Sequence, residues 1–429
     1  MSETAPMTTA TGVSDETETG PTLLQPLRVR DFRLVFGGET ISVLGDQFHF
    51  VALAWLALQL TGSGLALGTV LMTAAIPRAI FILVGGAFSD RFSPRTLMLV
   101  SNAIRGVVVG ALAALVLTGR AELWHLYVLA ATFGVVDAFF YPALNTIVPM
   151  LVPSRLLPPA NAVIQGSTQV MSLIGPALAG ALIALLDTGP AFVVDAASFG
   201  VAALAVFLVR GGRRAAPHDD DERPSVLASI GGGIRAAWAD RAVRGTLVLT
   251  AAFNLAFTGP VSVGLAWLAE ERFDAGSVGF GVLFSAWGAG ALIGAIAGGS
   301  ITRVPRFGTV LLGAACLIGI GFAAIGVAPS VGVALAIIAP IGVLIGFINV
   351  QYISWLQRRV EPELLGRVMS LVMLGSIGLA PVSLAIAGVM VDLGAVTLMY
   401  VAAGGLVLGA ALAGLAWGVP ALMDQEPAR

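Results

Sequence analysis

The chain has 429 residues and a formal charge of −2; 57% of its residues are hydrophobic before its 53 glycines are counted, and 11% are charged. Soluble domains carry about 25% charged residues and about 45–50% apolar residues, glycine included. So few charges cannot cover a water-soluble fold of this length, so the composition excludes a soluble enzyme and indicates a protein that crosses a lipid bilayer several times.

The basic residues narrow the possible functions. All 23 are arginine, and the chain contains no lysine. A phosphate-binding loop and a Schiff base both need lysine, so the sequence excludes an ATP-hydrolysing domain within this chain and predicts no enzyme. The arginines form no patch of the kind that binds nucleic acid. The single cysteine, Cys316, can make neither an intramolecular disulfide nor a cysteine metal cluster. We therefore expect no cofactor, no metal, no ATP and no nucleic acid as partners.

Twelve apolar runs follow a polar, acidic segment at the start of the chain. Residues 1–27 lack the basic and apolar regions of a secretory signal, and we expect them to form a disordered cytoplasmic tail. Each later run is long enough to cross a bilayer as a helix of about 20 residues. The predicted spans are about 34–60, 65–88, 96–118, 122–142, 161–186, 190–209, 245–269, 277–300, 308–328, 331–355, 367–391 and 394–418.

One long polar connection divides the runs into six and six, and it is expected to be a flexible linker. The halves repeat one another: Pro176 precedes Asp187 by 11 residues, and Pro381 precedes Asp392 by 11. Parallel repeats of six spans are a transporter architecture. The predicted units are an N-terminal six-helix bundle at 28–209, a cytoplasmic linker at 210–244, a C-terminal six-helix bundle at 245–418 and a cytoplasmic tail at 419–429.

The arginines also predict the orientation in the membrane. If the N-terminus is cytoplasmic, all but four arginines fall in cytoplasmic segments. Arg120 and Arg272 fall outside, and Arg78 and Arg105 lie within spans. The positive-inside rule requires such a bias, so we expect a multi-pass protein of the cell membrane with both termini in the cytoplasm.

Two motifs in the first half resemble those of a known family. The end of the second span reads Gly86-Ala-Phe-Ser-Asp90-Arg91-Phe-Ser-Pro-Arg95. This stretch resembles the cytoplasmic loop signature of the major facilitator superfamily, with serine and proline where the signature has glycine and a basic residue. The fifth span is similar to the antiporter signature of drug exporters in that superfamily, and its matching residues are Gly166, Gly175, Pro176 and Gly180.

Three further stretches resemble one branch of that superfamily, which holds macrolide-efflux and siderophore-export proteins. They are Ser42-Val-Leu-Gly-Asp46, Phe139-Phe-Tyr-Pro-Ala143 and Gly366-Arg367-Val-Met-Ser370. The resemblance covers about residues 27–418. It implies an all-α integral membrane protein with twelve transmembrane helices in two pseudo-symmetric six-helix bundles. It also implies an antiporter that exports small molecules in exchange for protons.

Ionisable residues inside the predicted spans gather in the first half. A charge within a bilayer is costly unless it is paired or hydrated, so each one indicates a functional site. The spans of the second half contain no internal charge. We therefore expect the chemistry that couples transport to protons in the first half. The residues are Glu39, Asp46 and His49 in the first span, Arg78 in the second, Arg105 in the third, Asp137 in the fourth and Asp195 in the sixth.

Depth in the membrane predicts two ion pairs. At about 1.5 Å per residue, Glu39 and Arg78 lie about 8 and 10 Å from the cytoplasmic edge. Arg105 and Asp137 lie about 12 and 8 Å from it. Both pairs are level, so Glu39–Arg78 and Arg105–Asp137 are candidate ion pairs. For the first of them a structural role is the leading interpretation.

Asp46 is different, because no arginine lies at its depth of about 18 Å. A carboxyl there is costly to leave charged, which suits a group that takes up and releases protons. We favour Asp46 as the proton-coupling residue, with Asp137 second and Glu39 also a candidate. The alternatives for Asp46 are a helix kink at Gly45 or contact with substrate. We expect His49 to be a polar packing residue.

Aromatic and amide side chains could line a substrate cavity. Aromatic rings on helices often face lipid or a neighbouring helix, whereas a buried amide needs a partner that a substrate can supply. Glycines repeat every four residues in the eighth and tenth spans, which predicts close helix packing without a ligand. The candidate cavity residues are Phe139, Phe140, Phe253, Asn254, Asn349 and Tyr352.

Three functions compete for this pattern. The first is a proton-coupled exporter of amphiphilic small molecules, which works by alternating access of two six-span bundles. The second is a nutrient importer or uniporter on the same fold, for which a denser polar set in both halves is expected. The third is a membrane sensor or scaffold, for which a sizeable soluble domain is expected. The one-sided carboxyls and the apolar remainder favour the exporter.

The loop after the second span predicts a latch between the halves. By the resemblance, Asp90 faces the start of the eleventh span near Gly366 and Arg367, where a carboxylate meets unpaired helix amides. Asp90→Asn should populate the state that is open to the cytoplasm and slow turnover. Distances between spin labels in loop 89–96 and at residue 367 would report it, and an unchanged distribution with normal turnover contradicts the latch.

Overall fold

The structure is a computed structural model that describes residues 22–89, 92–211, 241–301, 304–360, 368, 369, 372, 375 and 378–424, with the backbone alone for 82–89. Every regular element within these residues is a helix. The predicted tail 1–27 and linker 210–244 lie largely outside them. The predicted tail 419–429 begins with a short helix, α16 (Val419–Asp424), in which Val419 and Met423 are buried.

Eleven helices in the described residues are long and apolar enough to cross a membrane. A twelfth predicted span, 367–391, is described as a helix only over α14 (Ala380–Asp392). The helix α9 (Leu265–Trp267) continues α8 through π-helical turns, so that residues Arg241–Arg272 form a single span. The other bounds are α1 (Arg30–Thr61), α2 (Gly64–Ser89), α3 (Pro94–Leu117), α4 (Leu123–Leu151), α5 (Leu157–Leu186), α6 (Thr188–Leu208), α8 (Arg241–Gly259), α10 (Gly276–Ser300), α11 (Phe307–Gly326), α12 (Val331–Arg359) and α15 (Val396–Ala416).

The helix α4 is longer than its sequence predicts. The expected span ends at 142, but α4 continues through Pro142 and Pro149 to Leu151. A proline removes one helix hydrogen bond, and transmembrane helices tolerate it because neighbouring helices and hydroxyl groups satisfy the freed carbonyls. The carbonyl groups that lose an amide partner here are those of Ala138 and Asn145, four residues before each proline.

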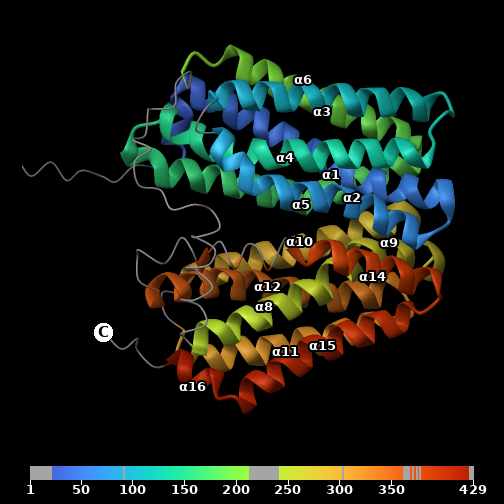
Figure 1. Ribbon diagram of the computed structural model, residues 1–429, viewed down its shortest axis with the longest axis vertical. Coiled ribbons are helices and arrows are strands. Elements are labelled where there is room, and N and C mark those ends of the chain that lie inside the picture. Colours follow the sequence, from blue (N-terminus) through green and yellow to red (C-terminus); the bar gives the residue numbers. More distant parts are fainter. Residues whose placement is uncertain are drawn as a thin grey trace, which may run out of the picture.

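The helices form two groups that follow the chain, α1–α6 in one half and α8–α16 in the other (Figure 1). Two seams join the halves, because α2 packs against α14 and α5 packs against α10. A Cβ on Gly68 would lie 2.6 Å from the carbonyl oxygen of Leu384, and a Cβ on Gly281 would collide with that of Pro176. The seams therefore depend on glycine, whose missing side chain lets the two backbones touch.

The glycine repeats of the second half pack α10 against α12, as the sequence predicts. A Cβ on Gly290 or Gly294 would collide with the carbonyl oxygen of Ala339 or Val343. Small residues at helix contacts allow this approach in a membrane, where packing rather than water exclusion holds helices together.

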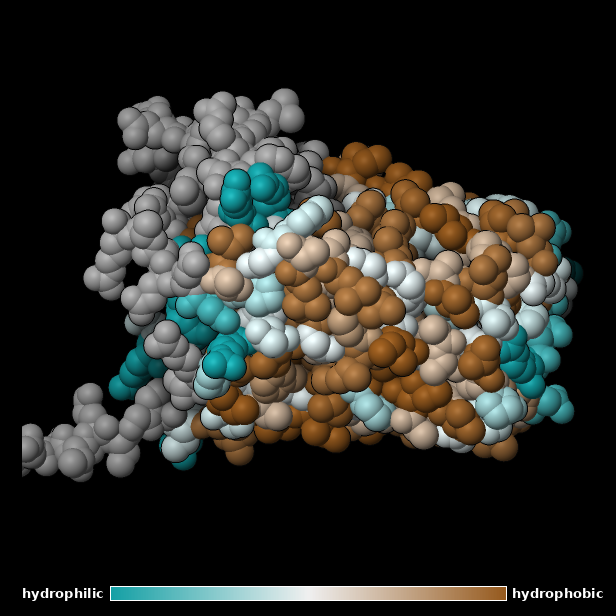
Figure 2. Space-filling model, turned by 90° about the horizontal axis from the view of Figure 1, so that it is seen from below, coloured by the Kyte–Doolittle hydropathy of each residue, from teal (hydrophilic) through white to brown (hydrophobic). Residues whose placement is uncertain are grey.

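Large apolar side chains cover the outside of the molecule. Figure 2 shows a broad hydrophobic band between two more polar ends. Leu185 is 80% exposed and Val107 is 71% exposed. An apolar surface of this extent is stable against lipid and not against water.

Among the described residues, most hydrogen bonds between the halves lie at one end of the bundle. We call the end where α1 begins and α16 finishes the terminal end, and the end where α1 finishes and α2 begins the distal end. At the distal end, the hydroxyl of Ser63 donates to Asp392 at 2.7 Å, and the amide of Leu65 donates to the same carboxylate at 3.2 Å. At the second seam, the hydroxyl of Ser277 donates to the carbonyl oxygen of Gly180 at 3.0 Å. The structure is therefore closed at its distal end.

Asp392→Ala should loosen this closure. The substitution removes an acceptor that caps the start of α2 across the seam, and losing such a cap costs about 0.5–2 kcal/mol, enough to change a two-state population several-fold. Spin labels at Leu117 and Val327, in a Cys316→Ser background, should report a larger share of long distances across the distal end.

Glu122→Ala is the matched control, because the bonds of this distal carboxylate stay within its own half. It should leave the distances unchanged. A distance distribution in Asp392→Ala that matches the wild type would show that the cap does not hold the halves together.

Candidate functional site

Three charged residues from three helices meet inside the first half. Arg105 on α3 donates a hydrogen bond to Asp137 on α4 and forms an ion pair with it. Arg78 on α2 lies 4.0 Å from the other oxygen of the same carboxylate. The structure thus brings together Arg105 and Asp137. Among the described residues it does not pair Glu39 with Arg78, because equal depth does not fix the direction in which a side chain leaves its helix.

Aromatic rings enclose the Arg105 guanidinium. It lies 4.5 Å from the ring centre of Phe140, 5.5 Å from that of Phe199 and 5.7 Å from that of Phe133. Cations bind favourably to ring faces, most strongly where water is excluded. Phe140 is therefore a packing partner of the cation and not a lining residue of either cavity below. Phe139, which packs on Phe81, does not line them either.

A cavity of about 310 Å³ lies between the halves. Arg78 and Asp137 are its charged lining residues, so the ion pair faces a space in which solvent or substrate can reach it. The other lining residues are Phe50, Leu71, Ala74, Ala75, Gly134, Thr258, Ser262, Ala380 and Leu384.

Asp46 and Glu39 lie partly buried on α1 without a counter-ion. Neither makes a hydrogen bond or an ion pair with any described residue. Arg105 is occupied by Asp137, so it acts on these two carboxyls only through its longer-range field. The first half therefore holds more buried carboxyls than guanidinium groups, which is the condition for proton uptake.

A second cavity, of about 330 Å³, lies within the second half. Four predicted cavity residues line it: Phe253, Asn254, Asn349 and Tyr352. Asn254 donates to the carbonyl oxygen of Thr250 at 2.9 Å, whereas the Asn349 amide has no hydrogen-bond partner among the described residues. The described lining residues carry no charge, so the cavity suits an apolar molecule with a few polar groups.

The antiporter-like residues of α5 lie mostly at helix contacts. Pro176 and Gly180 touch α10 of the other half, and a Cβ on Gly175 would lie 2.5 Å from the side chain of Gln47 on α1. A Cβ on Gly166 would meet open space. This part of α5 is therefore the surface on which the two halves meet.

Most of the predicted gating loop lies outside the described residues. This holds for Asp90, Arg91, Gly366 and Arg367, and of Gly86 only the backbone is described. Arg95 is described, and it contacts its own half.

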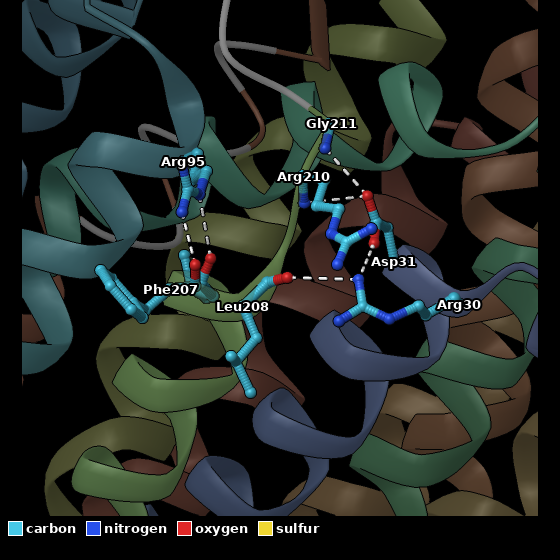
Figure 3. Close-up of polar contacts among 8 residues, drawn as sticks. Arg30, Asp31, Arg95, Phe207, Leu208, Arg210 and Gly211 are labelled. Atoms are coloured by element: carbon cyan, nitrogen blue, oxygen red, sulfur yellow. Dashed lines mark hydrogen bonds and ion pairs between the residues drawn. The ribbon is translucent and has the colours of Figure 1, made fainter.

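Arg95 binds the end of α6 (Figure 3). Its Nε donates to the carbonyl oxygen of Val206 at 3.1 Å, and a second nitrogen donates to that of Phe207. Arg30 donates to the carbonyl oxygen of Leu208 at 3.3 Å. The last carbonyls of a helix lack partners and carry partial negative charge, which two guanidinium groups offset here. Among the described residues, Arg95 thus holds α6 and makes no contact across the halves.

Sequence reasoning missed a buried pair on α1 and α6. His49 Nδ1 lies 3.0 Å from an oxygen of Asp195, whose side chain is fully buried. The sequence analysis placed Asp195 in the sixth span and assigned it no partner. The available signal was that a histidine and a carboxylate inside a membrane each need a partner.

The Arg105–Asp137 pair generates a stability prediction. Removing one member of a buried pair leaves the other charge unpaired and costs about 3–5 kcal/mol, whereas apolar replacement of both is often near neutral. Asp137→Leu should therefore lower the thermal unfolding midpoint in detergent clearly more than the double variant Arg105→Met/Asp137→Leu. A single variant as stable as the wild type would contradict the burial of an obligatory pair.

Comparison with known proteins agrees with this architecture. The family model described as Major Facilitator Superfamily matches residues 35–382. The "Multidrug efflux pump Tap" of Mycolicibacterium fortuitum is 26% identical over 384 residues, 88% of this chain and 90% of that protein. The "Macrolide efflux protein A" of Streptococcus pyogenes is 21% identical over 345 residues, 79% and 84% of the two chains.

A solved structure supports the fold alone. The crystal structure of the peptide transporter POT in complex with sulfate superposes with a TM-score of 0.73 at 12% identity, over 92% of this chain and 96% of that one.

Proposed function

Because the chain belongs to the Major Facilitator Superfamily, a family of multi-pass membrane transporters, we propose that it is a proton-coupled exporter of amphiphilic small molecules. Its substrates would be drug-, antibiotic- or siderophore-like. It would work in the cell membrane by alternating access, with both termini in the cytoplasm. Two relatives that match over most of their length are named as an efflux pump and an efflux protein, which supports export over import.

One observation carries the proposal: the two halves hold different chemistry. Among the described residues, the buried acidic, arginine and histidine side chains lie in the first half, and the described lining of the cavity in the second half is uncharged. A proton site and a site for an apolar molecule can therefore be occupied independently. An antiporter needs that independence, because it carries its two ligands in opposite directions.

Asp46 is the best candidate for the proton site. Asp137 contacts two guanidinium groups, which neutralise its carboxylate without a bound proton. Asp46 has no such partner among the described residues, so a bound proton is what can neutralise it. Glu39 shares this lack of a counter-ion and lies about two turns away on the same helix.

The uncharged cavity is the best candidate for the substrate site. Its walls are aliphatic and aromatic, and the unpartnered amide of Asn349 supplies one polar anchor. The Asn349 amide is exposed on the cavity wall, so it can donate a hydrogen bond to a ligand and accept one from it, whereas the apolar walls take amphiphilic molecules of varied shape.

The closed distal end fits an intermediate of the export cycle. If the distal end faces the outside, as the arginine distribution predicts, the described conformation is shut to the outside. A substrate would then enter from the cytoplasm, and opening of the distal seams would release it. A proton would bind from the outside and leave to the cytoplasm, which drives the return step.

Transport of a fluorescent dye panel into inside-out vesicles with an imposed pH gradient tests the proposal. Asp46→Asn should reduce gradient-driven transport to below about one-tenth of the wild-type rate, because the amide keeps the side-chain shape but carries no proton. Exchange of labelled for unlabelled dye at equal pH should persist.

Asp187→Asn is the control, since this carboxyl is exposed at the distal end and carries no proposed role in coupling. If the rate of wild-type transport does not depend on the pH gradient, the proposed proton coupling is wrong. If Asp46→Asn transports dye with full dependence on the gradient, Asp46 is not the proton site.

A further inference from the structure

The buried pair of His49 and Asp195 lies where α1 packs closely against α6. Gly45 makes this approach possible, because a Cβ there would collide with the hydroxyl of Ser198 and lie 2.9 Å from Oδ1 of Asp195. The His49 ring stacks on Phe133 at 4.3 Å, so its orientation is fixed on both sides. A glycine thus brings an imidazole and a carboxylate together inside the first half.

Each of the two side chains has a second polar atom, outside the His49–Asp195 contact, that lacks a hydrogen-bond partner among the described residues. Oδ1 of Asp195 is buried and makes no hydrogen bond, and Nε2 of His49 has none with a described residue. A fully buried carboxylate with a free oxygen is costly unless its partner carries positive charge. The imidazolium form of His49 is that partner, and neutral His49 still offers a lone pair on Nε2 when Nδ1–H points at Asp195.

The pair stands next to the proposed proton site. His49 follows Asp46 by three residues on α1, which places it on a neighbouring part of the helix face and about 4.5 Å nearer the distal end. The ionisable groups whose charges reach His49 are Asp46 on α1, Arg105 on α3, Asp137 on α4 and Asp195 on α6.

We propose that His49 is a second proton-carrying residue, which exchanges a proton with Asp46 through Nε2, and that Asp195 is its positioning residue. The inference rests on the proton coupling proposed above. In one step, which needs the two groups within hydrogen-bond reach directly or through one water, the Asp46 carboxyl gives its proton to Nε2, so that Asp46 becomes a carboxylate and His49 an imidazolium. The Nδ1–H of that imidazolium stays bonded to the Asp195 carboxylate. The reverse step restores both groups, and the total charge of the three side chains does not change.

The role of Asp195 follows from the two nitrogens of imidazole. Its carboxylate holds the proton on Nδ1, which leaves the lone pair of Nε2 free to accept, and it stabilises the positive ring once the proton arrives. The proton path would therefore run along α1 from the distal end through His49 to Asp46. The distal end is shut in the present conformation, so a proton from the outside would reach His49 only after the distal seams open.

Full-length protein in proteoliposomes tests the inference with two variants. His49→Gln keeps a side chain that can bond Asp195 but cannot carry a proton, and Asp195→Asn keeps the contact but not the charge. Each should lower dye transport driven by an imposed pH gradient at least about tenfold, because relaying a proton contributes at least that much. Dye exchange at equal pH should stay within about twofold of the wild type.

The pH profile separates positioning from packing. Without the Asp195 charge an imidazolium forms less readily, so Asp195→Asn should need an outside pH lower by about one unit or more for the same rate. Ser198→Ala, one turn away on α6 and without an ionisable group, should behave as the wild type in every assay.

Two results would overturn the inference. If both variants keep gradient-driven transport within about twofold of the wild type, His49 carries no proton. If both lose dye exchange as severely as gradient-driven transport, the pair only fastens α6 to α1. The wild type and Asp46→Asn are measured in the same assays. They distinguish the absence of a relay through His49 from the absence of proton coupling itself. Loss of coupling in Asp46→Asn with none in His49→Gln rejects the relay alone.

Discussion

The requirement that a charge inside the membrane must be paired organises the first half. Arg105 is nearly fully buried, and it is neutralised by Asp137 and covered by three aromatic rings. These partners come from α4 and α6, so the guanidinium fastens three helices together. Because Arg105 and Arg78 both turn to Asp137, neither forms an ion pair with Asp46. Asp46 is left without a counter-ion because both guanidinium groups bind Asp137, and the proton coupling proposed above depends on this.

The seams between the halves obey a different constraint. Their helices touch through glycine and through a few hydrogen bonds, with no ion pair across them among the described residues. Contacts of this kind stabilise the closed arrangement, and breaking them costs little free energy, as alternating access requires. Close packing of small residues also lets one helix rotate against another without displacing large side chains.

The success of sequence reasoning at the site depended on the kind of information used. Depth along a helix was enough to pair Arg105 with Asp137, because α3 and α4 are neighbours and their two side chains turn towards each other. The same count failed for Glu39 and Arg78, because it says nothing about the direction around a helix. The sequence placed Asp195 in the sixth span without a partner, but Gly45 lets that helix approach α1, and the carboxylate is buried there beside His49.

The sequence by itself determined the class of protein, the positions of its spans and the half in which its charges lie. These follow from composition and from apolar runs, since a bilayer admits only helices whose length matches its thickness. Only the tertiary structure decided which charges meet, which aromatic rings serve as packing and which line a cavity. Those outcomes depend on the rotation of each helix about its axis and on glycine contacts between helices far apart in the chain, and neither is encoded in a local pattern.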